Sequence, residues 1–215
     1  MIDDTMASIT EASDKSWYKI NEIPIVKFVE CMKALYATLE GKQKHYSADD
    51  PFYKQVFMAF FKMPPEEWEH TRRIIQVERA FTMELGNLHQ ALMGSFPHTE
   101  NYKTGHSSGC DIGHVDGSWV AEVKNNVNTM NSSSKESVLR KLQLQHTLGK
   151  RAILVIINGN TRHEIKNEVE YISGREFYNE LSGRVNFMDD LLKTLVDCVS
   201  KYDTYDALMR CLETP

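Results

Sequence analysis

The sequence of 215 residues contains only four cysteines, and they are far apart along the chain. No two of them form a C-x-x-C pair, which is the usual spacing of a structural zinc site. A disulfide framework normally needs more cysteines in a shorter, secreted chain. We therefore expect neither kind of cross-link, and we expect the protein to work in the reducing cytoplasm. The four are Cys31, Cys110, Cys198 and Cys211.

Long apolar runs are also missing. No stretch approaches the roughly 18 apolar residues that a membrane-spanning helix needs. The first residues, MIDDTMASITEASDK, lack the basic and apolar regions of a signal peptide. We therefore expect no membrane as a partner. The net charge of −5 and the pI of about 5.9 argue against a protein that coats nucleic acid, but they allow local binding through a basic cleft.

Several common catalytic motifs are absent. The chain has no G-x-x-x-x-G-K-[ST], G-x-G-x-x-G or G-x-S-x-G, so we expect no nucleotide cofactor and no serine hydrolase. Eight histidines are present, but none form H-E-x-x-H or a zinc-finger spacing. Zinc could be suspected at His106, Cys110 and His114. Strand alternation turns Cys110 and His114 away from Asp111, so core or surface histidines are the better interpretation.

Apolar residues at helical spacing predict three helices in the first part of the chain, at residues 23–41, 48–63 and 65–94. Gly41 is a plausible C-cap of the first helix. Acidic residues in the first turn of the third helix suit its dipole. The N-terminal part of the chain is therefore predicted to be helical.

A sheet is predicted from the middle of the chain onward. Residues 118–124 and the β-branched run RAILVIIN at 151–158 flank a helix at 135–148. Two strands joined in this way form a parallel, right-handed β-α-β unit. EVEYIS, at residues 168–173, is a further strand candidate, and helices follow to the end of the chain.

Two S-x-x-E sequences, Ser133–Glu136 and Ser173–Glu176, have the form of a capping box and predict helix starts. We expect an α/β (mixed α+β) fold in which helices flank a central mixed sheet of about four or five strands. The predicted single domain spans residues 1–215. It consists of a helical N-terminal part (1–95), an α/β core (96–173) and C-terminal helices (174–215).

The stretch CDIGHVDGSWVAEVKNN, at residues 110–126, holds two alternating runs separated by Asp116-Gly117. Asp-Gly between two such runs predicts a hairpin with a two-residue turn. Closing the hairpin there places Asp111 directly opposite Glu122. Residues so opposed have Cβ atoms about 4.5–5.5 Å apart, and like charges there are destabilising. We therefore predict that a divalent cation lies between the two carboxylates.

Lys124 joins this pair, because strand alternation turns Val120, Glu122 and Lys124 to one face. Carboxylate oxygens suit Mg²⁺, and a bound ion lowers the pKa of water and neutralises charge that develops on a phosphate. Lys124 could orient a nucleophile or stabilise the transition state. An acid and a lysine at a strand edge are usually surface decoration, but the hairpin geometry favours a site.

Glu84 is the fourth candidate residue. It lies within an apolar stripe of the helix at 65–94, where an acid is costly unless it is paired or bound to metal. Two interpretations stay open. Glu84 is linked to the metal site, or it is a structural carboxylate that accepts a hydrogen bond from a neighbour such as Asn87 or from the backbone.

Asp111, then Glu122-Val123-Lys124, with the preceding helical Glu84, resembles the D…E-x-K core of the PD-(D/E)XK nuclease superfamily. Cys110 stands where many members have proline. The segments AEVKNNVNTMNSSSK, ELGNLHQALMGS and YISGREFYNEL resemble type II restriction endonucleases that cut GGNCC or GGWCC sites. The likeness covers roughly residues 84–181.

The resemblance implies a restriction-endonuclease-like fold and Mg²⁺-dependent hydrolysis of double-stranded DNA, with Mn²⁺ able to substitute, by a homodimer that recognises a short palindrome. It implies that the carboxylates of Asp111 and Glu122 and the backbone carbonyl of Val123 bind the metal. Lys124 and Glu84 would complete the catalytic centre. Neither the recognition sequence nor the dimer interface follows from the resemblance.

The segment NNVNTMNSSSK, at residues 125–135, leaves the catalytic strand and runs to a helix N-terminus, so it is predicted to pass beside the scissile phosphate. Asparagine amides, serine hydroxyls and helix N-termini bind phosphate oxygens, and asparagine also reads adenine. A solvated loop is the plainer interpretation. The predicted DNA contacts are Asn125, Asn126, Ser132, Ser133, Ser134 and Lys135.

Two other functions remain open on the sequence alone. One is a non-catalytic DNA-binding or interaction protein on the same fold, in which the carboxylate pair only binds an ion. The other is a repair-type or RNA-directed nuclease that shares the core. Cleavage of plasmid DNA into discrete fragments in Mg²⁺, abolished by EDTA, would separate the restriction endonuclease from both.

Overall fold

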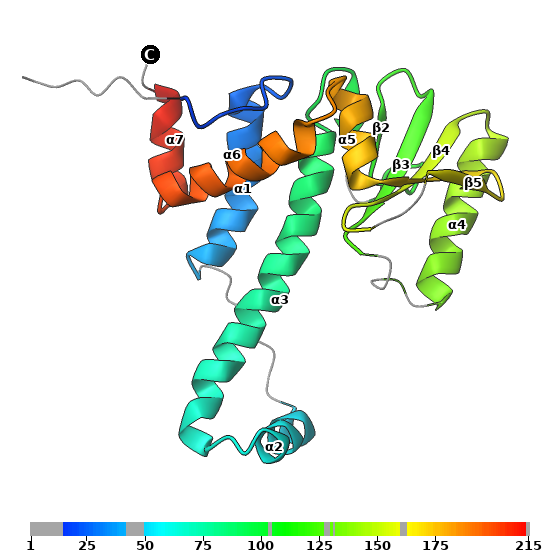
Figure 1. Cartoon of the computed structure of the whole chain (residues 1–215). Helices are drawn as coiled ribbons and strands as arrows, with labels where there is room; N and C mark the ends of the chain where they lie inside the picture. The colour runs from blue at the N-terminus through cyan, green and yellow to red at the C-terminus, as the bar shows by residue number, and fades with distance from the viewer. Residues whose placement is uncertain are drawn as a thin grey trace, which may run out of the picture.

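The computed structural model describes residues 15–41, 50–102, 105–126, 130, 132–159 and 163–213. Helices flank a mixed sheet, as the sequence predicts (Figure 1). The helices are α1 Ile25–Leu39, α2 Pro51–Phe60, α3 Pro65–Met93, α4 Ser132–Thr147, α5 Gly174–Ser182, α6 Phe187–Lys201 and α7 Tyr205–Glu213. The strands are β1 Thr99–Asn101, β2 Ile112–His114, β3 Trp119–Lys124, β4 Arg151–Ile156, β5 Glu164–Lys166 and β6 Val169–Ser173.

The sheet has six strands in the order β1-β2-β3-β4-β6-β5. The three central strands β3, β4 and β6 are parallel, and the outer pairs β1–β2, β2–β3 and β5–β6 are antiparallel. The predicted β-α-β unit is confirmed, since α4 connects the parallel strands β3 and β4. The prediction of four or five strands is wrong. The strands β1 and β5 have only three residues each, too few to show a period of two in the sequence.

The two faces of the sheet carry separate apolar clusters. On one face, Val120, Leu154 and Ile156 pack against Val138 and Leu142 of α4. On the other face, a larger cluster joins Ala121, Val123, Ile153, Val155 and Ile172 to α1, α3, α5, α6 and α7. The strand β4 is buried on both faces, as its continuous β-branched sequence predicts.

The helix α3 begins at the predicted residue and runs unbroken for 29 residues. Its C-terminal half packs against α1, and its N-terminal half extends away from the sheet (Figure 1). The short helix α2 lies at the far end of α3 (Figure 1). The predicted helices at residues 23–41, 48–63 and 65–94 are therefore confirmed, within a few residues at each end.

The register of the β2–β3 hairpin is the predicted one. Ile112 pairs with Ala121. Continuing this register by one residue places Asp111 opposite Glu122, just before β2 begins.

The turn of this hairpin differs from the predicted two-residue turn. That turn needs a positive φ at both Asp116 and Gly117, and only Gly117 has one, at 77°. The turn hydrogen bond runs from the N–H of Gly117 to the carbonyl of His114 over 2.9 Å, and residues 115–118 all lie outside the strands. The prediction of the turn type is wrong, but the register is unaffected because the loop is longer by one residue on each side.

The three predicted helix ends are confirmed to within one residue, but one predicted cap is wrong. Gly41 follows α1 with a φ of 68°, as a glycine at a helix C-terminus does. Ser173 caps α5, and the side chain of Glu176 bonds back to it, so the capping box is formed. Ser133 is not an N-cap, because α4 already begins at Ser132 and Ser133 lies inside its first turn.

Two general features of the described residues bear on the earlier expectations. The four cysteines are free thiols. None of the helices in the described ranges is long and apolar enough to cross a membrane.

The capping box gives a first prediction. Ser173→Ala removes the hydroxyl that accepts a hydrogen bond from the N–H of Glu176, so it should lower the free energy of unfolding by about 1 kcal/mol. Ser200→Ala, an exposed change inside α6, is the matched control and should be neutral or slightly stabilising. Urea unfolding followed by circular dichroism measures both. Equal stabilities of the two variants would contradict the prediction.

Candidate metal and nuclease site

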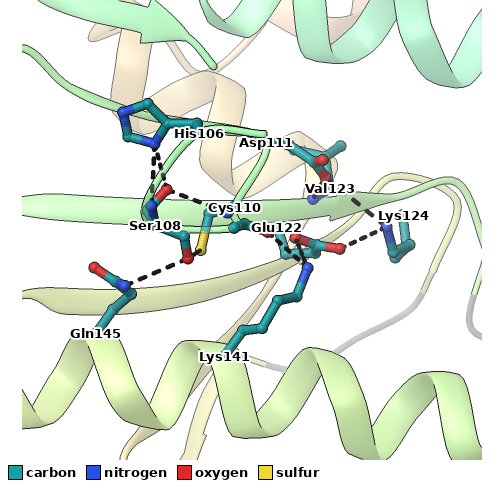
Figure 2. A network of polar contacts seen from close by, with 10 residues as sticks. His106, Ser108, Cys110, Asp111, Glu122, Val123, Lys124, Lys141 and Gln145 are labelled. Atoms are coloured by element: carbon teal, nitrogen blue, oxygen red, sulfur yellow. Dashed lines mark hydrogen bonds and ion pairs between the residues drawn. The ribbon is translucent and has the colours of Figure 1, made fainter. Parts of the chain in front are cut away.

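Asp111 and Glu122 lie beside each other at the open end of the β2–β3 hairpin (Figure 2). Glu122 is in the middle of β3, and its side chain is only 5% exposed. Asp111 is half-buried, and its Oδ2 accepts a hydrogen bond of 2.8 Å from the backbone N–H of Val123. This bond uses the backbone of β3 to hold the Asp111 carboxylate at the edge of the strand, next to the Glu122 side chain.

Lys124 lies beside the two carboxylates, and its ammonium contacts both (Figure 2). Its Nζ is 2.9 Å from Oε1 of Glu122 and 3.8 Å from Oδ2 of Asp111. The structure therefore brings together the three residues that the hairpin and the strand alternation predict. Backbone pairing sets much of their arrangement, because Glu122 and Lys124 belong to β3 and Asp111 directly precedes β2.

A second lysine, Lys141, contacts the same site and was missed in the sequence. It rises from α4 and places its Nζ 3.1 Å from Oε2 of Glu122 (Figure 2). The same ammonium donates a hydrogen bond of 2.7 Å to the carbonyl of Gly109, two residues before Asp111. A signal was present, since Lys141 lies three residues after the buried Val138 and so shares the sheet-facing side of α4.

The loop that leads into Asp111 is held against α4. The carbonyl of Ser108 accepts a hydrogen bond from the buried side chain of Gln145, and the Ser108 hydroxyl accepts one from the N–H of Cys110. Gly109 has a φ of 65°, so the backbone turns sharply there. Cys110 consequently packs with Val120 on the α4 side of the sheet. The prediction that Cys110 projects away from the Asp111 face is therefore wrong, because the regular alternation begins only after it.

The electrostatics of the site favour a bound cation. Burial raises the pKa of Asp111, and the negative charge of Glu122 raises it further, while the Val123 N–H and the two lysines oppose the shift. Burial, followed by the charge of Glu122, also raises the pKa of the Cys110 thiol to about 11. Burial contributes most to both pKa shifts and the charge of Glu122 adds to it, and a cation beside Asp111 would oppose both effects by favouring the ionised carboxylate.

The donors present fit Mg²⁺ better than a softer metal. Mg²⁺ typically binds one or two carboxylates and keeps several waters, and Asp111 and Glu122 supply such a pair. No group of three or more histidine, cysteine, aspartate or glutamate side chains within the described ranges could hold a metal ion. A metal here would therefore complete its shell with backbone oxygen, such as the carbonyl of Val123, and with water.

Glu84 lies in α3 and is buried, as its place in the apolar stripe predicts. Its Oε2 accepts a hydrogen bond of 3.1 Å from Nδ2 of Asn87, which is the partner considered in the structural interpretation. The hydrogen bonds and ion pairs described above for the side chains of Asp111 and Glu122 lead instead to Val123, Lys124 and Lys141.

The predicted DNA-contacting residues form two groups. Asn125 follows β3, and its Nδ2 donates a hydrogen bond of 3.0 Å to the carbonyl of Thr82 in α3. Ser132, Ser133, Ser134 and Lys135 form the exposed first turn of α4. Residues 127–129 and 131 of this segment lie outside the described residues.

Comparison with known proteins identifies the family. The sequence model described as Eco47II restriction endonuclease matches residues 20–203, a range that includes every site residue above. The chain belongs to this family. The match confirms the resemblance to type II restriction endonucleases that the D…E-x-K pattern and its flanking segments indicate.

A relative of this Eco47II-family chain is the Type II restriction enzyme Sau96I of Staphylococcus aureus, which is 27% identical over 120 residues. The aligned part covers 53% of this chain and 45% of the relative. The chain thus aligns with less than half of the length of that enzyme. No solved structure gives a significant match.

The two lysines at Glu122 generate a prediction about stability. Lys141→Met removes one of the two cations that pair with a buried carboxylate, so it should lower the free energy of unfolding by about 1–2 kcal/mol, after allowance for the partial exposure of Lys141. Arg140→Met is the matched control, because Arg140 pairs with Glu136 on the surface of α4. The control should change stability by about 0.5 kcal/mol or less.

Denaturant unfolding of the two variants without added metal measures the difference. A Lys141→Met protein as stable as Arg140→Met would mean that the Lys141–Glu122 pair contributes nothing to the fold. Lysine and methionine have similar helix propensities, so the comparison reports the lost contacts and not the helix.

Proposed function

We propose that the protein is a Mg²⁺-dependent type II restriction endonuclease. It hydrolyses phosphodiester bonds of double-stranded DNA at a short palindromic or pseudo-palindromic site, in the cytoplasm and without a nucleotide cofactor. The observation that carries the proposal is the convergence of Asp111, Glu122 and Lys124 in a chain of the Eco47II restriction endonuclease family. Type II restriction endonucleases generally use divalent metal ions, which agrees with the donors in this site.

Each residue of the site has a separate role in the proposal. Asp111 and Glu122, with the carbonyl of Val123, would hold the Mg²⁺. When bound, the ion activates water and neutralises charge on the phosphate. The ammonium of Lys124 orients the attacking water and stabilises the charge that develops on the phosphate oxygens. Lys141 positions Glu122 and, through Gly109, the loop that ends at Asp111.

Glu84 and Asn125 link α3 to the site in this proposal. Asn125 follows Lys124 directly and is bonded to α3 at Thr82. It lies so close to Gly86 that a Cβ at that position would come within 3.1 Å of its Nδ2. The end of the catalytic strand is therefore packed on the turn of α3 that carries Glu84. Substitution of Glu84 tests whether this residue acts on the reaction or supports the packing. A role in the reaction predicts a loss of cleavage that exceeds the loss of stability, and a role in packing predicts that the two fall together.

The N-terminal half of α4 offers a surface for the DNA backbone. A hollow of about 340 Å³ is lined by the side chains of Ser133, Glu136, Ser137, Arg140, Lys141 and Leu144, in which Glu136 is paired with Arg140. Hydroxyls and cations of this kind bind phosphate oxygens, and the helix N-terminus favours negative charge. Because Lys141 both lines the hollow and contacts Glu122, the surface leads directly to the carboxylates. We propose that Asn125, Asn126, Ser132, Ser133, Ser134 and Lys135 contact DNA along this path.

The reaction itself gives a prediction. Asp111→Asn and Lys124→Ala should each reduce cleavage of plasmid DNA by on the order of 10²-fold or more, because each removes a group at the reacting phosphate. Asp111→Asn should also keep or raise the melting temperature, since it relieves repulsion with Glu122 while its amide oxygen still accepts from Val123. Lys124→Ala should still bind DNA.

Asp116→Asn is the matched control for Asp111→Asn, because Asp116 belongs to the same hairpin but lies at its exposed tip. It should cleave as the wild type does. The measurement is the rate of fragment formation in Mg²⁺, with EDTA as the blank and Mn²⁺ as the alternative metal. Near wild-type cleavage by Asp111→Asn would refute the site. Binding without any cleavage by the wild type would favour a non-catalytic DNA-binding protein, and a smear of fragments would favour a repair-type nuclease.

The α4 surface gives a separate prediction. Lys135→Ala should weaken DNA binding and lower the slope of log K against log salt by about one, because it removes one phosphate contact. Lys150→Ala, beyond the other end of α4, should leave the slope unchanged. Replacing Ser132, Ser133 and Ser134 together by alanine should weaken binding further. Fluorescence anisotropy in Ca²⁺ measures the affinities.

The serine triple variant needs a stability control, because these residues form the first turn of α4 and loss of their local hydrogen bonds could cost about 1 kcal/mol. Circular dichroism provides it. If the triple variant and Lys135→Ala are folded and bind cognate DNA as the wild type does, the segment is a solvated linker after all.

A further inference from the structure

A helical arm formed by α2 and the first turns of α3 carries an apolar surface that the nuclease site does not use. The arm extends away from the sheet (Figure 1). Within it, Tyr53 and Phe57 of α2 pack edge-on against the buried Trp68 of α3, with ring centroids 6.1 and 5.8 Å apart. One side of α2 is therefore occupied, and its packing partner is α3.

Next to this packed side, α2 bears a stripe of three large apolar residues at helical spacing. Phe52, Val56 and Phe60 are four residues apart and share one face. They are 81%, 67% and 78% exposed, and no described part of the chain covers them. A hollow of about 450 Å³ is lined by the stripe together with Asp50, Tyr53, Phe57 and Phe61.

The contacts within one chain do not explain why the arm is stable. The helix α2 has ten residues and none of them is buried. Isolated helices shorter than about 12–15 residues are marginal in water, and most helices in proteins are stabilised by packing of an apolar face. Asp50 caps α2, which contributes only about 1 kcal/mol. The bare stripe is the face that would normally be packed.

We infer that a second copy of this chain covers the stripe, so that α2 packs antiparallel to its own copy about a two-fold axis. Such a contact is self-complementary, since the same stripe lies on both sides. It also pairs opposite charges, because Asp50 at the N-terminus of one α2 would lie near Lys62, just beyond the C-terminus of the other. The helix dipoles of an antiparallel pair favour the same arrangement.

The size of the stripe agrees with this occupant. Aromatic side chains offer about 150–250 Å² each, so the exposed stripe presents roughly 400 Å² of apolar surface. A standard interface buries about 800 Å² per partner, with an apolar centre and a polar rim. The stripe would therefore supply the centre, and the charged flanks of α2 and α3 would supply the rim.

The inference deepens the proposed function and rests on it for its biological role, because cutting both strands of a palindrome calls for two catalytic sites related by a two-fold axis. The physical contact itself depends only on the arm. The two can consequently fail separately.

The experiment compares the wild type with Phe52→Glu/Phe60→Glu by sedimentation velocity, with and without DNA in Ca²⁺. The wild type should be a dimer and the double variant a monomer, with helical content unchanged by circular dichroism. Val185→Glu is the control, because Val185 is as exposed as Phe60 but lies between α5 and α6, and this variant should stay dimeric. In Mg²⁺, the double variant should nick supercoiled plasmid and lose concerted cleavage of both strands.

A second variant keeps the test decisive if the double variant misfolds. Val56 is at the centre of the stripe, so two copies of Val56→Cys should form a disulfide-linked dimer on mild oxidation, whereas the wild type should not. A wild type that is monomeric with and without DNA, a double variant that stays dimeric, or a Val56→Cys protein that stays uncross-linked would each overturn the inference. A cleaving monomer would refute the arm contact alone, and a dimer that never cleaves would refute the function alone.

Discussion

The close approach of two carboxylates, Asp111 and Glu122, is the constraint on which the rest of the structure depends. The β2–β3 register forces them together, and both are withdrawn from water. Repulsion of this kind persists only where the surroundings compensate it. The compensation comes from two lysines and one backbone N–H, supplied by β3 and α4. The packing of α4 on β3 and on the loop before β2 is therefore arranged around an unfavourable pair that chemistry requires.

Residues 110–124 show which parts of such a site a sequence can reveal. The register follows from the alternation of apolar residues, since a slip by one position would turn Ile112 and Ala121 out of the core. The type of turn cannot be read from this alternation, because several loops are compatible with the same register. Asp116-Gly117 has the favoured sequence of a two-residue turn and does not form one. Asn167-Glu168 forms one, with φ values of 48° and 67°, although glutamate is a poor signal for it.

The parts that could not be predicted depend on contacts between distant segments. The strand β1 exists because the end of α3 brings it against β2, and three residues carry no pattern of their own. Lys141 reaches Glu122 only because α4 crosses β3 next to Glu122. The point at which a helix crosses a strand depends on how the helix packs on the sheet, and helix periodicity does not specify it. The buried state of Glu84 was predictable from its stripe, and Asn87 was one of the partners that the sequence offered, but only the structure shows that Asn87 donates to it.

The unbroken course of α3 has a consequence for the geometry of cutting. The helix runs without a kink-forming residue from Trp68, in the arm, to Glu84, beside the catalytic strand. At 1.5 Å per residue this is about 24 Å of rigid spacer. If two copies join through the arm, the separation of their active sites is set by the length of this helix. The stagger between the two nicks would then be a mechanical property of the scaffold, and adding or removing turns of α3 would change it without altering any catalytic residue.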